Sequence, residues 1–210
     1  MVYFPINLNL QNQPVVVIGG GQVGLRKIRN LLRAGASLKV IEPQPTSVLI
    51  QMGKKKTIQL IQRPYRSGDL KGALLGIAST ENPTVQESIV REAHSRKIWL
   101  NVVDKPSVCD FVFPAVFTRG DLMMAISTGG TSPALAKKIR QDLEKIFGEE
   151  YTTLLKLLKS LRGRVVFKNF KDRSKRFENF LKSPVLQFIR ARDKEAIRKL
   201  VQASFGKEAG

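Results

Sequence analysis

The stretch PVVVIGGGQVGLRKIRNLLRAGASLKVIEP, residues 14–43, decides the fold of this chain. A short apolar run, Val15–Ile18, predicts a buried strand, and the glycine turn after it leads into a helical pattern over Gln22–Ala34. Gly35 is a typical helix end, and Leu38–Ile41 predicts a second buried strand. A strand, a helix and a second strand in this order are typical of a βαβ unit in a parallel sheet.

The glycine turn between the first strand and the helix has the spacing G-x-G-x-x-G. Gly19 permits a tight turn, Gly21 lets the backbone approach a pyrophosphate, and Gly24 lets the helix pack closely on the sheet. The amides of Gln22 and Val23 then lie at a helix N-terminus, where free N–H groups favour an anion. We interpret the turn as a phosphate-binding turn for a dinucleotide; the alternative is a glycine turn used only for packing.

A carboxylate stands where a dinucleotide site needs one. Glu42 ends the second predicted strand, 21 residues after Gly21, where it can accept hydrogen bonds from ribose hydroxyls. A negative group there disfavours a 2′-phosphate, so the sequence predicts NAD rather than NADP. Pro43 and Gln44 follow directly, and we expect them to border the adenosine.

The βαβ pattern continues beyond this unit. Ile58–Gln62, Leu74–Ala78 and Leu100–Val102 predict further strands, and the region from about residue 84 to 96 predicts a helix. The loop after the second of these strands leaves the same edge of the sheet. Its residues Thr80 and Asn82 either contact the nicotinamide half of the cofactor or cap the following helix, and both interpretations stay open.

One carboxylate at this edge is the candidate catalytic group. Asp104 directly follows the apolar run Trp99–Val103 and is predicted to face the crevice where parallel sheets bind ligands. A dehydrogenation removes a hydride and a proton; because the cofactor takes the hydride, the protein has to supply only a base. The alternative is an aspartate that closes a turn before Lys105 and Pro106.

The pattern changes after Pro114. Two apolar runs around Gly120–Asp121 predict an antiparallel hairpin, and Ser132 is the expected N-cap of a helix that ends near Phe147. Everything after Gly148 is helical and basic in pattern. We therefore predict an α/β protein: a Rossmann-like parallel sheet, a small α+β segment and a C-terminal helical part, with domains at residues 1–113, 114–147 and 148–210.

Composition narrows the function classes. The chain has 210 residues, is 42% hydrophobic and carries a net charge of +19. Residues 151–210 alone hold 16 Lys or Arg against five Asp or Glu, a net +11, and such a field attracts polyanions. The alternative is a solubilising basic surface. A membrane span needs about 20 consecutive apolar residues, and no run approaches that length, so we expect no membrane partner.

The reactive side chains favour redox chemistry over hydrolysis. The single cysteine, Cys109, cannot form an internal disulfide, and the N-terminus does not resemble a secretion signal, so we expect a cytoplasmic protein. The single histidine, His94, lies among charged residues in a predicted helix, and no spacing resembles a closed zinc site, so we expect no bound metal. Ser127 has no histidine pattern behind it that would indicate a serine nucleophile.

Four segments together resemble one known family. They are VVVIGGGQVGLRKIRNLLRAGASLKVIEP at 15–43, ASTENPTVQESI at 78–89, NVVDKPSVCDFVFPA at 101–115 and AISTGGTSPALAKKIRQDLEKIFG at 125–148. The chain is similar to the siroheme synthase N-terminal family, whose members are precorrin-2 dehydrogenases and sirohydrochlorin ferrochelatases. The resemblance is strong over residues 1 to about 150 and looser in the basic tail.

The resemblance implies oxidation of precorrin-2 to sirohydrochlorin with NAD⁺, followed in some members by insertion of Fe²⁺. It implies that Asp104 is the proton acceptor and that Gln22, Val23, Pro43 and Gln44 contact NAD. It also implies that the chain forms a homodimer through residues 114–147. Three positions depart from the frequent pattern of the family, namely Gly24 for alanine, Gln86 for asparagine and Thr128 for serine. The methyltransferase module of some relatives is missing, so we expect methylation to come from another protein.

The basic tail separates two functional hypotheses. The tetrapyrrole carries eight carboxylates, so a tail from Tyr151 that contributes Lys or Arg to a substrate cleft would favour its capture. The alternative function is an NAD-binding redox-sensing regulator whose basic C-terminal helices bind nucleic acid. These helices show no recognition-helix pattern, and Asp104 would have no role in a regulator, so we expect no nucleic-acid partner.

Overall fold

The computed structural model describes residues 3–165 and 169–206. The chain divides into two compact units, Met1–Phe113 and Pro114–Gly210. The predicted first and third domains extend over residues 1–2, 166–168 and 207–210, which lie outside the described residues. The predicted boundary at residues 147 and 148 stays a prediction.

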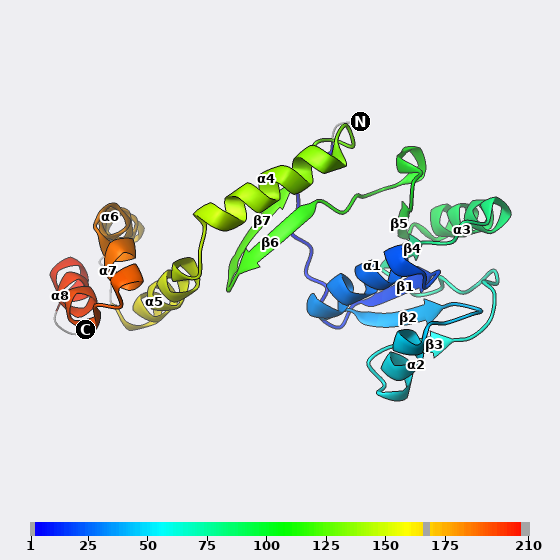
Figure 1. Cartoon of the computed structure of the whole chain (residues 1–210), viewed down its shortest axis with the longest axis horizontal. Helices are drawn as coiled ribbons and strands as arrows, with labels where there is room; N and C mark the ends of the chain where they lie inside the picture. Colours follow the sequence, from blue (N-terminus) through cyan, green and yellow to red (C-terminus); the bar gives the residue numbers. More distant parts are fainter. Residues whose placement is uncertain (1–2, 166–168, 207–210) are drawn as a thin grey trace. The chain divides into compact units, whose positions relative to one another are not determined.

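The first unit is built on a five-stranded parallel sheet with the order β3-β2-β1-β4-β5 (Figure 1). Its strands are β1 (Pro14–Ile18), β2 (Ser37–Ile41), β3 (Gln59–Ile61), β4 (Leu75–Ala78) and β5 (Trp99–Val102). The predicted Rossmann-like parallel sheet is therefore confirmed, and each predicted strand is present to within two residues at either end.

Side chains on the two faces of the sheet form two separate cores. On β1 the alternation of side chains sends Val15 and Val17 to one face and Val16 and Ile18 to the other. Helices α1 (Gln22–Arg33) and α2 (Ser47–Lys54) cover the first face, and α3 (Pro83–Arg96) covers the second. Parallel strands buried on both faces are expected to be continuously apolar, as β1 is.

Helix α2 was not predicted from the sequence. The helix is eight residues long, its N-cap Thr46 accepts a hydrogen bond from the Leu49 amide at 3.5 Å, and Leu49 is its one buried residue. One buried residue in eight produces no helical repeat that a periodicity argument can detect.

The second unit begins with the predicted hairpin, β6 (Ala115–Arg119) paired with β7 (Leu122–Ile126). Helix α4 (Pro133–Ile146) lies along this hairpin (Figure 1). Ser132 caps α4 as predicted, because its hydroxyl oxygen accepts a hydrogen bond from the Leu135 amide at 3.2 Å. The antiparallel pair and the helix that follows it are thus confirmed.

Four helices complete the second unit: α5 (Glu150–Arg164), α6 (Phe170–Lys182), α7 (Val185–Ala191) and α8 (Lys194–Phe205). Their apolar faces share one core, in which the rings of Phe180 and Phe205 meet edge to face at 5.2 Å between centroids. Over residues 3–165 and 169–206, no helix combines the length and the apolar character that crossing a membrane requires.

A buried carboxylate fastens α3 to the loop before β4. Glu92 is 6% exposed and accepts hydrogen bonds from the Tyr65 hydroxyl at 2.5 Å, the Gly68 amide at 2.9 Å and Arg96 Nε at 2.9 Å. Burial alone would raise the pKa of Glu92, but these donors outweigh it, and the pKa lies below its ordinary value of 4.5.

We expect Glu92→Gln to lower the free energy of unfolding by about 2–4 kcal/mol, because several charge-assisted hydrogen bonds weaken together. A carboxylate whose pKa is lower in the folded state stabilises that state at pH values above the pKa that it has in the unfolded chain. The difference between wild type and variant in urea unfolding should therefore be complete at pH 7 and shrink as the pH falls below 4.5. Glu87→Gln, at an exposed position of α3, is the matched control, and equal losses in both variants would contradict the prediction.

Candidate functional site

The register of the parallel sheet brings the predicted site residues to one edge. Ile18 pairs with Ile41 and with Ala78, and Ala78 pairs with Val102, so four strands end level with one another. The residues that follow these ends are Gly19, Glu42, Ser79 and Val103. Neighbouring strands are about 4.8 Å apart, so the loops from β2 to β5 span roughly 15 Å, a length suited to an extended cofactor.

Two of the three motif glycines are required by packing. Gly19 has φ +99°, and a Cβ there would lie 2.4 Å from the carbonyl oxygen of Ser79. A Cβ at Gly24 would lie 2.4 Å from the carbonyl oxygen of Gly19. These contacts leave no room for a side chain, and they hold the β1–α1 turn tightly against the loop after β4.

The third motif glycine faces open space. Gly21 has an ordinary φ of −61°, and a Cβ added to it would meet no atom within 4 Å. Neither strain nor packing therefore explains the glycine in this structure. A ligand that approaches the backbone closely does explain it, as expected for a pyrophosphate at this turn.

The N-terminus of α1 offers hydrogen-bond donors to a ligand. Gly21 is the N-cap, no side chain caps the helix, and its first turn holds no acidic residue. The Leu25 amide donates to the Gly21 carbonyl oxygen at 2.8 Å, so the Gln22 and Val23 amides precede the helical ladder. Both residues are exposed, and their position fits a bound phosphate.

Glu42 ties the end of β2 to the glycine turn. Its carboxylate accepts hydrogen bonds from the Gly20 amide at 2.5 Å and from the Gln44 amide at 3.0 Å. Each oxygen keeps a further lone pair with which it can accept a ribose hydroxyl. Pro43 and Gln44 are exposed beside it, so the predicted adenosine border is accessible. The residues present thus fit a nicotinamide dinucleotide.

Gln86 binds the loop after β4, a role that was not predicted from the sequence. Gln86 is 7% exposed, and its side-chain amide donates a hydrogen bond to the Thr80 carbonyl oxygen at 2.6 Å. Asn82 caps α3, because its side-chain oxygen accepts a hydrogen bond from the Val85 amide at 3.2 Å. The capping interpretation therefore holds for Asn82, while contact of Thr80 or Asn82 with a cofactor stays a prediction.

Asp104 lies in the turn that follows β5. Its φ is +60°, a left-handed conformation that aspartate tolerates better than most residues with a side chain. The strand pairing continues up to the turn, where the Val103 amide donates to the Ala78 carbonyl oxygen at 2.9 Å. Asp104 thus closes a turn and is also exposed at the edge that carries the glycine motif.

A thiol fixes the loop that contains Asp104. The Val102 amide donates to Cys109 Sγ at 3.1 Å, and the thiol lies 3.2 Å from the Val102 carbonyl oxygen and 3.3 Å from that of Lys105. Burial raises the pKa of this thiol, so Cys109 stays neutral near pH 7. The loop from Asp104 to Cys109 therefore starts just after Val102, at the end of β5, and returns to Val102 through the Cys109 thiol.

Lys27 is a further polar residue that was not singled out in the sequence. It lies on the buried stripe of α1, three residues after Gly24 and four before Leu31, and its Nζ donates to Asn101 Oδ1 at 2.8 Å. Its Nζ also lies 4.1 Å from the centroid of the Phe113 ring. A lysine on an otherwise buried stripe is a signal that the sequence contained.

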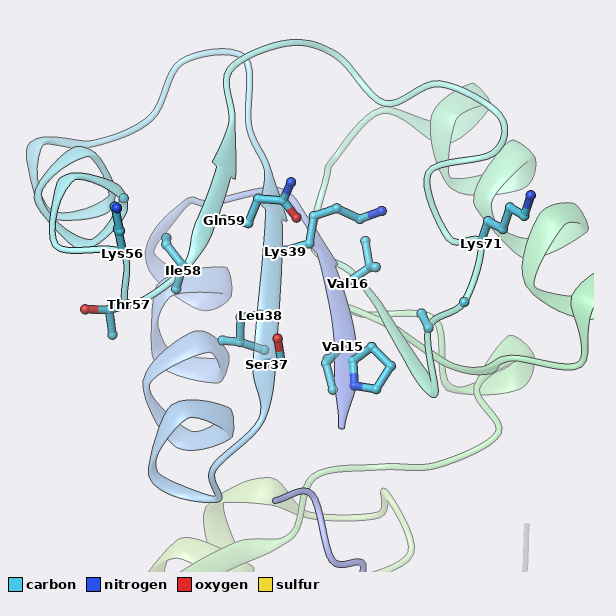
Figure 2. Close-up of a pocket in the computed structure, with 14 residues that line it drawn as sticks. Val15, Val16, Ser37, Leu38, Lys39, Lys56, Thr57, Ile58, Gln59 and Lys71 are labelled. Atoms are coloured by element: carbon cyan, nitrogen blue, oxygen red, sulfur yellow. The ribbon is translucent and has the colours of Figure 1, made fainter. Parts of the chain in front are cut away.

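A separate hollow at the opposite end of the strands does not form the site. Its volume is about 520 Å³, and its walls include the first residues of β1 and β2 together with Lys39, Lys56 and Lys71. Figure 2 shows these lysines on three separate segments, with ammonium groups that do not converge. Within the described part of the chain, no three His, Cys, Asp or Glu side chains form a group that could hold a metal ion.

We expect Gly19→Ala and Gly21→Ala to separate folding from cofactor binding. Gly19→Ala should lower the free energy of unfolding by about 1–3 kcal/mol, because its left-handed φ and the Ser79 carbonyl both oppose a side chain. Gly21→Ala should leave stability unchanged within about 0.5 kcal/mol but weaken NAD⁺ binding at least about tenfold. Calorimetric titration and urea unfolding measure the two effects. Gly163→Ala is the control, and NAD⁺ affinity of Gly21→Ala equal to wild type would refute the phosphate role.

Comparisons with known proteins agree with this geometry. Residues 6–115 match the family model described as “Putative NAD(P)-binding”, and residues 119–146 match “Sirohaem biosynthesis protein central”. The chain is 35% identical over 207 residues to the siroheme synthase of Methylococcus capsulatus, covering 97% of this chain and 44% of that protein. It is 37% identical over 204 residues to the siroheme synthase of Ectopseudomonas mendocina, covering 96% and 44%.

The chain thus spans less than half the length of the curated relatives it matches. A solved structure of SirC, a precorrin-2 dehydrogenase, superposes with a TM-score of 0.75 at 25% identity, covering 96% of this chain and 98% of that one. The first family model covers more than half of the chain, and its span includes the glycine turn, Glu42 and Asp104. The chain therefore belongs to the family that this model describes as “Putative NAD(P)-binding”, as its glycine motif indicated.

Proposed function

We propose that the chain oxidises precorrin-2 to sirohydrochlorin with NAD⁺ in siroheme biosynthesis. The observation that carries the proposal is the common edge of the sheet, where the phosphate turn of α1 and the exposed Asp104 lie two strands apart. The likeness to SirC over nearly the full length of both chains supports the substrate class.

The chemistry divides between cofactor and protein. NAD⁺, when bound, supplies the hydride acceptor. The Gln22 and Val23 amides would hold the pyrophosphate, and Glu42 would accept hydrogen bonds from the ribose hydroxyls, which would favour NAD⁺ over its 2′-phosphorylated form. Asp104 accepts the proton from the neighbouring ring position, so that the macrocycle loses two hydrogens and gains one double bond.

We expect Asp104→Asn to reduce kcat for precorrin-2 oxidation by at least about 100-fold, because an amide cannot accept the proton. Asparagine tolerates the left-handed turn, so the fold and the Kd for NAD⁺ should stay within about twofold of wild type. The measurement is an anaerobic spectrophotometric assay with precorrin-2 and NAD⁺. Glu81→Gln removes an exposed carboxylate from a neighbouring loop at the same edge and serves as control.

An Asp104→Asn variant that turns over precorrin-2 as fast as the wild type would refute the role of Asp104 as proton acceptor. A redox-sensing regulator should show no turnover with precorrin-2 and should be indifferent to the substitution. Anaerobic incubation of sirohydrochlorin with Fe²⁺, compared with the spontaneous rate, tests whether the same site also inserts iron, which stays a prediction for this chain.

We also propose that the chain forms a homodimer through its hairpin. Val116 is 41% exposed and Met123 is 49% exposed, and alternation places both on the hairpin face opposite Phe117, which is buried. The register pairs Val116 with Ala125 and Thr118 with Met123, so these side chains form one continuous exposed face. Exposed apolar faces of this kind are typical of interfaces between copies of a chain.

Met123→Lys should therefore shift the chain from dimer to monomer, because a charge at the centre of an apolar interface loses its hydration on association. Sedimentation equilibrium measures the change, and we expect the dimer dissociation constant to rise at least about 100-fold. Thr153→Lys, which adds the same charge at an exposed position of α5, is the control. A wild-type chain that sediments as a monomer would contradict the proposal.

A further inference from the structure

The lysine at position 27 joins α1 to the strand that carries the proposed catalytic residue. Asn101 lies on β5 between Leu100 and Val102, which both face the α3 core, so alternation turns Asn101 to the α1 face. Lys27 Nζ reaches it from α1 and donates to its Oδ1 at 2.8 Å. The bond joins residues 74 positions apart in the sequence.

The orientation of Asn101 is determined from both sides. Its side-chain nitrogen donates to the Phe111 carbonyl oxygen at 2.9 Å, so its oxygen points to Lys27. Asn101 is 6% exposed, and both ends of its amide therefore have partners. Phe113 adds a ring whose centroid lies 4.1 Å from the ammonium group.

Among the described residues, no carboxylate oxygen lies within ion-pair distance of the Lys27 ammonium group. Its one side-chain hydrogen bond among the described residues goes to the neutral Asn101 amide. Burial lowers the pKa of Lys27 to about 8, and the neighbouring Arg26 contributes in the same direction, whereas the Asp104 carboxylate acts in the opposite direction. A lysine with these neighbours and a perturbed pKa, at the ligand edge of a sheet, is typical of functional sites.

We propose that Lys27 is a positioning residue of the reaction: it fixes the Asn101 end of β5 and holds a positive charge that attracts the Asp104 carboxylate. Asp104 follows Asn101 by three residues in the turn that ends β5, so the bond between Lys27 and Asn101 fixes the strand from which that turn starts. The inference rests on the proposed function, because it assigns Lys27 a part in the same proton transfer.

The coupling between Lys27 and Asp104 can be measured in the protein alone by NMR of lysine labelled with ¹³C at Cε. One resonance, absent in Lys27→Arg, should titrate near pH 8, well below the other lysines. Asp104→Asn should move this midpoint to lower pH, because a charge that favours the ammonium form is removed. Glu81→Gln should leave it in place. A Lys27 signal that titrates at the ordinary value of 10.5, or that ignores Asp104→Asn, would overturn the proposal.

Kinetics test the positioning role. Lys27→Met should lower kcat for precorrin-2 oxidation at least about tenfold, with KM for precorrin-2 and Kd for NAD⁺ within about twofold, because misplacement affects the transition state most. Lys27→Arg should recover most of the rate, since it keeps the charge and the contact with Phe113. Arg29→Met, at an exposed position of α1, is the control for charge removal.

The outcomes separate this inference from the proposed function. If the wild type shows no turnover with precorrin-2, the proposed function fails, and the NMR titration still tests the coupling. If Asp104→Asn abolishes turnover while Lys27→Met behaves as Arg29→Met does, the positioning role alone is refuted. If Lys27→Met does not fold, Lys27→Arg and the titration of the wild type still decide the question.

Discussion

The close approach of the β1–α1 turn to the loop after β4 is the constraint on which the site depends. It exists because Gly19 and Gly24 have no side chains, so the Ser79 and Gly19 carbonyls can pack where Cβ atoms would otherwise lie. With the turn in this place, the first amides of α1 lie at the sheet edge, and the Glu42 carboxylate can accept a hydrogen bond from the Gly20 amide. These contacts fix the backbone donors and the Glu42 carboxylate relative to one another, and groups that are held in place lower the entropy that ligand binding has to overcome.

The division of labour across this edge follows from the topology. Backbone donors come from α1, the Glu42 carboxylate comes from the end of β2, and the Asp104 carboxylate comes from the turn after β5. Parallel strands with right-handed crossovers bring all three to the same side, although Gln22 and Asp104 are far apart in the sequence. In the proposed reaction the protein needs few reactive side chains, because a nicotinamide cofactor takes up the hydride.

Local patterns predicted most of the sheet, because buried parallel strands and the α1 stripe leave a clear periodic signal in β1, β2 and α1. Helix α2 was not predicted, because Leu49 is its one buried residue and leaves no periodic pattern. The predicted site residues that can be located lie at one edge, but the roles of Lys27 and Gln86 were missed. Lys27 donates to a side chain 74 residues away in the sequence, and Gln86 donates to a backbone carbonyl oxygen. No spacing rule encodes such partners.

The segment after Asp104 has a further consequence for the outer border of the sheet. Strand β5 is an edge strand, and its outward amide and carbonyl groups belong to Leu100 and Val102. The Asp110 carboxylate accepts a hydrogen bond from the Leu100 amide, and the Asp110 amide donates one to the Leu100 carbonyl oxygen, both at 2.8 Å. Cys109 Sγ bonds to the amide and the carbonyl oxygen of Val102 in the same way. Because these groups are occupied within the chain, β5 offers no template to a strand of another molecule. The loop that presents the carboxylate thus also protects the protein against aggregation through this edge.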